Sequence, residues 1–92
     1  MNPLNKLIIR IITEQENIIG PLAVEQAEKV DGLKINWISK EITINGDEKK
    51  IIENLVSRYE KIFGRTSVEI CREIVHTMSD SIPKEDIPSS LQ

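Results

Sequence analysis

The sequence predicts an α+β fold that is mostly helical, with about four helices around one two-stranded β-hairpin in the order α-α-β-β-α-α. Over most of the chain, apolar residues recur at the three- and four-residue spacing of an amphipathic helix. Between residues 33 and 44 this spacing changes to the alternation of a β-strand. With 92 residues, 39% of them hydrophobic and 29% charged, the chain is long enough for one globular domain, expected over residues 1–78.

The first helix is predicted from its N-terminus. Asn2 suits the N-cap position, and Pro3 suits the first helical position because its missing N–H would have no partner there. Together with Ile9, the apolar positions cover roughly 200° of the helix surface, more than packing on one neighbour needs. We therefore expect two packing partners, one of which can belong to another chain. The regular apolar stripe consists of Leu4, Leu7, Ile8, Ile11 and Ile12.

A second, short helix is predicted from Pro21 to about Asp31, followed by Gly32 in a left-handed conformation. Its buried side would carry small residues, which allow close approach of another backbone. These are Ala23, Ala27 and Val30.

The hairpin is predicted with Ser39-Lys40 as its two-residue loop, which places Trp37 opposite Ile42 and Ile35 opposite Ile44. Because Ser-Lys is not a preferred sequence for such loops, a longer loop is the alternative. The pairing gathers one apolar face. That face consists of Leu33, Ile35, Trp37, Ile42 and Ile44.

Two further helices are predicted after the hairpin. Asp47 is the expected N-cap of the third helix and Gly64 its end, while Thr66 would open the fourth helix with a capping box to Glu69. The apolar stripe of the third helix is Ile51, Ile52, Leu55, Val56, Tyr59, Ile62 and Phe63. That of the fourth is Val68, Ile70, Cys71, Ile74, Val75 and Met78.

Residues 79–92 contain two prolines and four serines, and we expect them to form a flexible C-terminal tail. Ile82-Pro83 and Ile87-Pro88 recur five residues apart, so a short extended docking motif is the alternative.

Composition excludes several classes of function. The single cysteine excludes an internal disulfide, and the net charge of −3 weighs against a nucleic-acid-binding protein. No uninterrupted apolar run exceeds three residues, whereas a membrane-spanning helix needs roughly 20. The glycines form no phosphate-binding loop. We expect a cytoplasmic protein without a membrane segment or a cofactor.

Catalytic and metal-binding patterns are weak. Cys71 and His76 lie five residues apart, roughly 140° around a helix, so they cannot pair, and Cys71 is expected in the core. Glu73 and His76 form a Glu-x-x-His pair, which could bind a metal only across a dimer, with Glu69 or Asp80 assisting. A solvated helix face is the simpler interpretation.

A helix-turn-helix-like nucleic-acid-binding protein is an alternative. The predicted link Phe63-Gly64-Arg65-Thr66 is short, and residues 49–72 contain six basic and three acidic side chains. The second helix of this unit would expose Glu69, Glu73 and Asp80, which phosphates repel.

The sequence therefore favours a small non-catalytic interaction or regulatory module that forms a homodimer, with another protein as the alternative partner. The unpaired edges of the hairpin could also pair with a second chain. Ordinary core packing is the other role open to the expected contact residues. These are Leu7, Ile8, Ile9, Ile12 and Trp37.

Overall fold

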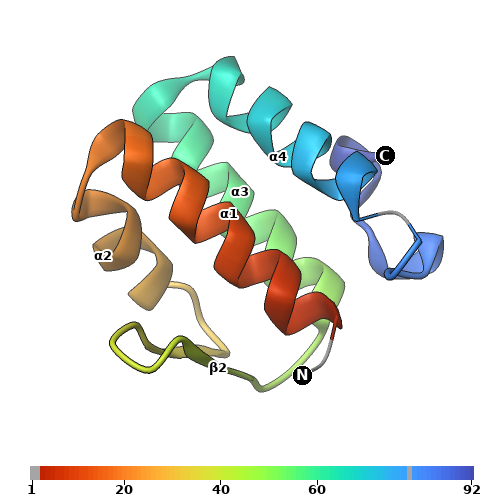
Figure 1. The fold of residues 1–92 in the computed structure, drawn as a ribbon, viewed down its shortest axis with the longest axis horizontal. Coiled ribbons are helices and arrows are strands. Elements are labelled where there is room, and N and C mark those ends of the chain that lie inside the picture. Colours follow the sequence, from red (N-terminus) through yellow and green to blue (C-terminus); the bar gives the residue numbers. More distant parts are fainter. Residues whose placement is uncertain (1–2, 79) are drawn as a thin grey trace.

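The computed structural model describes residues 3–78 and 80–92 (Figure 1). The elements are α1 (Pro3–Ile19), α2 (Leu22–Glu28), β1 (Leu33–Asn36), β2 (Glu41–Ile44), α3 (Glu48–Phe63) and α4 (Arg65–Thr77), followed by the 3-10 turns η1 (Lys84–Asp86) and η2 (Ser89–Leu91). This order, with one antiparallel two-stranded sheet, confirms the predicted fold class. The predicted N-cap, Asn2, lies outside the described residues.

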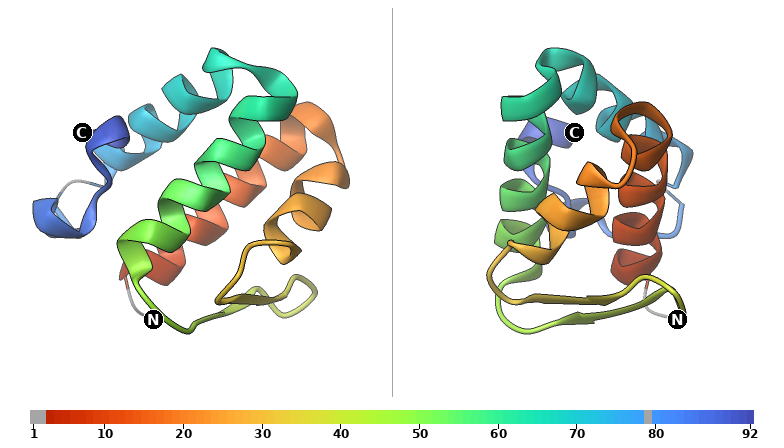
Figure 2. Two further views of the ribbon diagram at one scale, coloured as in Figure 1. Left: turned by 180° about the vertical axis from the view of Figure 1, so that it is seen from behind. Right: turned by 90° about the vertical axis from the view of Figure 1, so that its left-hand side faces the viewer.

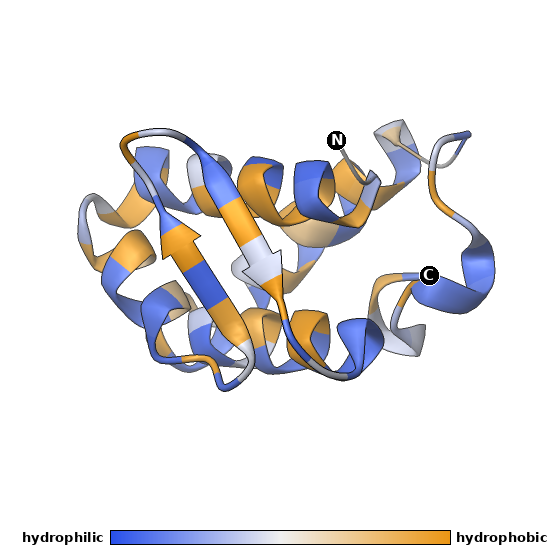
Figure 3. Cartoon of the chain, turned by 90° about the horizontal axis from the view of Figure 1, so that it is seen from below, coloured by the Kyte–Doolittle hydropathy of each residue, from blue (hydrophilic) through white to orange (hydrophobic). Residues whose placement is uncertain are grey.

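The helices α1 and α3 run side by side in the same direction, and α4 returns along them (Figures 1 and 2). The short helix α2 packs on both α1 and α3. The hairpin lies across one end of this bundle. Along each of its strands, hydrophobic and hydrophilic residues alternate (Figure 3). None of the helices in the described ranges is both long enough and apolar enough to cross a membrane.

The core is built mainly by the stripes of α1 and α3. The small side chains of Ala23 and Ala27 are fully buried, and Val30 is nearly so, which confirms the predicted buried side. The helix itself ends at Glu28, earlier than predicted, so Val30 lies after it. The wide apolar arc of α1 is used within the chain, because this helix contacts α2, α3, α4 and β2. The stripe residues that α1 and α3 bury are Leu4, Leu7, Ile8, Ile11 and Ile12, and Ile51, Ile52, Leu55, Val56 and Tyr59.

The hairpin has a four-residue loop over residues 37–40, so the predicted register was wrong by two residues. Ile35 pairs with Ile42, and Asn36 with Glu41. The favoured two-residue hairpin loops need positive φ at their first position, whereas of Ser39 and Lys40 only Lys40 has it (φ +58°). The Asn36 side chain instead accepts a hydrogen bond from the Ser39 N–H (3.3 Å). Because the shift is even, each strand keeps its predicted inward face.

Gly32 fixes the base of the hairpin. It has φ +83°, and a Cβ atom there would lie 2.5 Å from the Asn45 carbonyl oxygen. The Asn45 N–H donates to the Gly32 carbonyl at 2.7 Å, so the two backbones are held in contact. Only glycine satisfies both the conformation and the close approach.

The N-cap of α3 agrees with the prediction, whereas the N-terminus of α4 does not. The Asp47 side chain accepts from the Lys50 N–H (3.2 Å), which confirms the N-cap of α3. In contrast, α4 begins at Arg65, directly after Gly64 (φ +78°), and no side chain caps it. Thr66 therefore lies inside the first turn, and the expected capping box is absent from this helix start.

The C-terminal segment packs on the domain, which corrects the expectation of a flexible tail for the described part of residues 79–92. Ile82, Ile87 and Leu91 are buried in the same core cluster as the helices, and η2 contacts α4. The Gln92 side-chain amide donates to the carbonyls of Lys84 (3.2 Å) and Ile87 (2.9 Å). Three apolar residues spaced along an irregular segment bury surface without the periodicity of a helix or strand.

Candidate functional site

Most of the contact residues predicted on the first helix belong to the core. Leu7, Ile8 and Ile12 are fully buried within the chain, and Ile9 is partly buried against the same cluster. The prediction that these residues form a surface for a partner is therefore corrected: only Ile9 reaches the surface. Their wide arc reflects the number of elements that pack around α1 in one chain.

Trp37 is held against α1 by polar contacts. Its indole N–H donates to Glu16 Oε2 (3.2 Å), and Lys40 Nζ lies 3.4 Å from the ring centroid, in cation–π geometry. These contacts account for Trp37 within the chain. Its neighbour Ile38 is 99% exposed at the tip of the hairpin.

The described residues leave a group of large apolar side chains exposed away from the hairpin. These four, which we call the apolar end, are Ile18 (40% exposed), Leu22 (36%), Ile62 (41%) and Phe63 (41%). They lie on the last turns of α1 and α3 and at the start of α2, and these segments meet at the end of the bundle opposite the hairpin (Figures 1 and 2).

Two buried sets of hydrogen bonds bring these segments together. The Tyr59 hydroxyl donates to the Ala23 carbonyl at 2.7 Å, which ties α3 to the start of α2. The Ser67 hydroxyl donates to Gln15 Oε1 (3.2 Å), and the Gln15 amide donates to the Ser67 carbonyl (3.4 Å), which ties α1 to the start of α4. The apolar end lies one turn beyond these bonds on α1 and α3.

The apolar pattern of the sequence did not predict which turns of α1 and α3 are left uncovered by other elements. The stripe of α3 continues through Ile62 and Phe63 at regular spacing, and periodicity tells which face is apolar but not which turns another element covers. The burial of Gln15 and Ser67 was not predicted either, because polar side chains are usually exposed. The mutual hydrogen bonds allow both side chains to be buried.

Cys71 lies in the core, as expected from the sequence. Burial raises the pKa of its thiol to about 12, although the hydrogen bond from the Gln15 amide (3.9 Å to Sγ) acts in the opposite direction. A protonated, inaccessible thiol is a poor nucleophile at neutral pH. The cysteine therefore belongs to the buried contact between α1 and α4.

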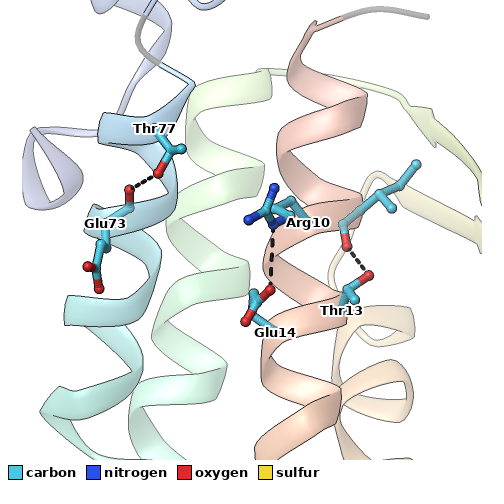
Figure 4. Close-up of polar contacts among 6 residues, drawn as sticks. Arg10, Thr13, Glu14, Glu73 and Thr77 are labelled. Carbon is cyan, nitrogen blue, oxygen red and sulfur yellow. Dashed lines mark hydrogen bonds and ion pairs between the residues drawn. The ribbon is translucent and has the colours of Figure 1, made fainter.

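The Glu73–His76 pair lies on the exposed side of α4. In Figure 4 the Glu73 side chain points away from Arg10 and Glu14 of α1, which form an ion pair (3.5 Å), and the Thr77 hydroxyl donates to the Glu73 carbonyl at 2.7 Å. In the part of the chain that the structure describes, no three His, Cys, Asp or Glu side chains are grouped to hold a metal ion. A metal site shared across a dimer, which would add Glu69 or Asp80, stays a prediction.

The possible helix-turn-helix region does not present a uniform basic face. Of its basic residues, Arg58 bonds to α2, whereas Arg65 and Arg72 line a groove between α3 and α4. Three acidic side chains line the same groove, so its charge is mixed. These are Glu53, Glu60 and Glu69. Nucleic-acid binding stays a prediction that no specific contact favours.

Comparison with known proteins found no family model, no curated protein and no solved structure that matches this chain.

Proposed function

We propose that this chain is a small non-catalytic interaction module that self-associates as a homodimer through the apolar end. The supporting observation is that Ile18, Leu22, Ile62 and Phe63 are exposed on segments that meet at one end of the bundle. Scattered exposed apolar residues are normal, but a contiguous group is typical of a contact surface. Among the described residues, only Ile38 adds another large apolar side chain of similar or greater exposure, and it lies at the hairpin tip.

A second copy of the chain suits this surface because the residues around it include a positive and a negative side chain. Each of these can pair with the opposite charge on the other copy. Arg65, at the start of α4, and Glu25, one turn after Leu22 on α2, are exposed on segments that flank the apolar end. Neither makes an ion pair within the described chain. In an isologous dimer each contact occurs twice, so a pair between Arg65 of one copy and Glu25 of the other would be formed two times.

The area that a dimer needs sets the extent of the surface. A stable interface buries about 800 Å² per partner, which is roughly one seventh of the 5402 Å² that the chain exposes. Four partly exposed side chains supply only the centre of such an area. The polar rim that includes Arg65 and Glu25 must therefore be part of the interface.

The proposed module acts in the cytoplasm, where a free thiol stays reduced. Cys71 is the chain's one cysteine, and it is unpaired and buried. This setting is compatible with a domain that owes its stability to packing and not to a disulfide.

Light scattering after size exclusion, across a dilution series, tests the proposal. We expect the wild-type chain to be a dimer at high concentration and to dissociate on dilution. Phe63→Ser and Leu22→Ser should each weaken the dimer by about tenfold or more, as expected for residues near the centre of an interface. Ile38→Ser is the matched control, because it removes an even more exposed apolar side chain at the other end.

Circular dichroism of each variant confirms that the fold is retained. A wild-type chain that stays monomeric at hundreds of micromolar would overturn self-association and leave another protein as the partner. Equal weakening by Ile38→Ser would also overturn the proposal, because it would show general loss of hydrophobicity and not loss of a specific surface.

A further inference from the structure

A cleft of about 330 Å³ lies between the C-terminal end of α2 and the middle of α3. The two helices lie side by side (Figure 2). The cleft is lined by a row of polar and basic side chains from one face of α3, and by a lysine from the end of α2. These are Asn54, Ser57, Arg58 and Lys61 from α3, and Lys29, the C-cap of α2. The rest of the lining is Gln26, Val30, Asp31 and Ile62.

Arg58 is fixed in this cleft by hydrogen bonds to neutral groups. Its Nη1 donates to Gln26 Oε1 at 3.1 Å, and its Nη2 donates to the Lys29 carbonyl at 3.4 Å. These bonds orient the partly buried guanidinium without neutralising its charge. The bond to the carbonyl also caps the end of α2, which explains Arg58 but not the two lysines beside it.

The charge of the cleft is opposite to that of the whole chain. Lys29, Arg58 and Lys61 face one carboxylate in the lining, Asp31, whereas the net charge of the chain is −3. Within residues 3–78 and 80–92, none of these three cations lies within ion-pair distance of a carboxylate. A local excess of uncompensated positive charge attracts anions.

We propose that this cleft binds a phosphoryl dianion, as inorganic phosphate or as a small phosphate monoester. Arg58 would be the oriented donor, Lys29 and Lys61 would supply charge, and Ser57 and Asn54 would donate neutral hydrogen bonds. A tetrahedral dianion offers enough acceptor oxygens for all these donors, and guanidinium groups bind phosphate oxygens with directed hydrogen bonds. The proposal does not rest on self-association, because none of these five donors belongs to the apolar end, although Ile62 of the apolar end also lines the cleft.

NMR titration of the ¹⁵N-labelled chain with sodium phosphate tests the site, with ionic strength held constant by sodium chloride. We expect saturable shifts confined to the end of α2 and to residues 54–61 of α3. Lys61→Gln and Lys29→Gln, both exposed lysines whose removal leaves the core intact, should each weaken binding by about threefold or more. Lys6→Gln removes the same charge from an exposed position on α1, outside the cleft lining, and should leave binding unchanged.

A second titration with glycerol 1-phosphate separates the two sources of the dianion. Tighter binding of the ester assigns the cleft to a phosphorylated small molecule, and tighter binding of inorganic phosphate assigns it to the free ion. The proposal would be overturned if no saturable shift occurred at tens of millimolar phosphate. It would also fail if Lys6→Gln weakened binding as much as Lys61→Gln, since this would indicate a general charge effect.

Discussion

The two ends of the bundle differ in how completely they are covered. At one end the hairpin closes the core, so that Leu33, Ile42 and Ile51 are buried. At the other end, on the last turns of α1 and α3, Ile18 and Ile62 are about 40% exposed. The same amphipathic stripe of α3 runs through both ends, so exposure depends on which turns another element covers.

The largest expected difference between the ends concerns two isoleucines of α3. Ile52 is fully buried and Ile62 is 41% exposed. We expect Ile52→Ala to lower the free energy of unfolding by about 3–4 kcal/mol through lost burial and a cavity. Ile62→Ala should cost less than about 1 kcal/mol. Urea denaturation of dilute protein measures both, and equal losses would show that the apolar end is covered in solution.

Substitution of one glycine at each end tests how closely the backbone is packed there. Gly32 and Gly20 both have positive φ, +83° and +70°, but only at Gly32 would a Cβ meet another backbone. Gly20→Ala should cost about 1–2 kcal/mol from conformation alone. Gly32→Ala should cost about 1 kcal/mol or more beyond that. Thermal unfolding compares the two, and similar losses would contradict a tight hairpin base.

The Tyr59 hydroxyl lies at the boundary between the covered core and the apolar end. Tyr59→Phe removes its bond to the Ala23 carbonyl and with it a buried contact between α3 and α2. We expect a loss of about 1–2 kcal/mol in the free energy of unfolding. Hydrogen exchange should also become faster at the start of α2. No change in exchange there would mean that this bond does not fix α2 to α3.

The last expected effect appears only in alkaline solution, as a dependence of stability on pH. Burial raises the pKa of Cys71 from 9.0 to about 12, and burial also raises the pKa of Tyr59. Below pH 9 the thiol is protonated in both states and contributes no pH dependence. Above pH 9, the thiol loses its proton in the unfolded chain but keeps it in the folded chain. The free energy of unfolding should therefore fall by about 1 kcal/mol per pH unit.

Urea denaturation of the wild type and of Cys71→Ala between pH 8 and pH 11 measures this contribution, over a range that spans the ordinary thiol pKa of 9.0. The variant should lose less stability with rising pH, with the remaining slope due mainly to Tyr59. Identical slopes for the two proteins would contradict the buried, protonated thiol.

Local chemistry in the sequence was sufficient for the elements that depend on neighbouring residues. Asp47 caps α3, and Ala23 and Ala27 are buried where α2 packs closely, as predicted. The inward positions of both strands were also predicted, because an even shift of register preserves them.

What could not be predicted depends on contacts between distant parts of the chain. Gln15 and Ser67 are 52 residues apart and can be buried only because each satisfies the other. Leu91 has no periodic partners, so nothing local shows that it reaches the core. The exposure of Phe63 likewise follows from the absence of cover at that turn, which only the packed structure reveals.

The distance between spin labels in the dimer tests the central claim, that the apolar end joins two copies. Cys71 is buried, so labels can be placed selectively at Thr66→Cys, near the apolar end, and at Ser39→Cys, in the hairpin loop. We expect an interchain distance below 29 Å, the longest dimension of one chain, for Thr66→Cys and a longer one for Ser39→Cys. The reverse order, or no interchain distance for either label, would contradict it.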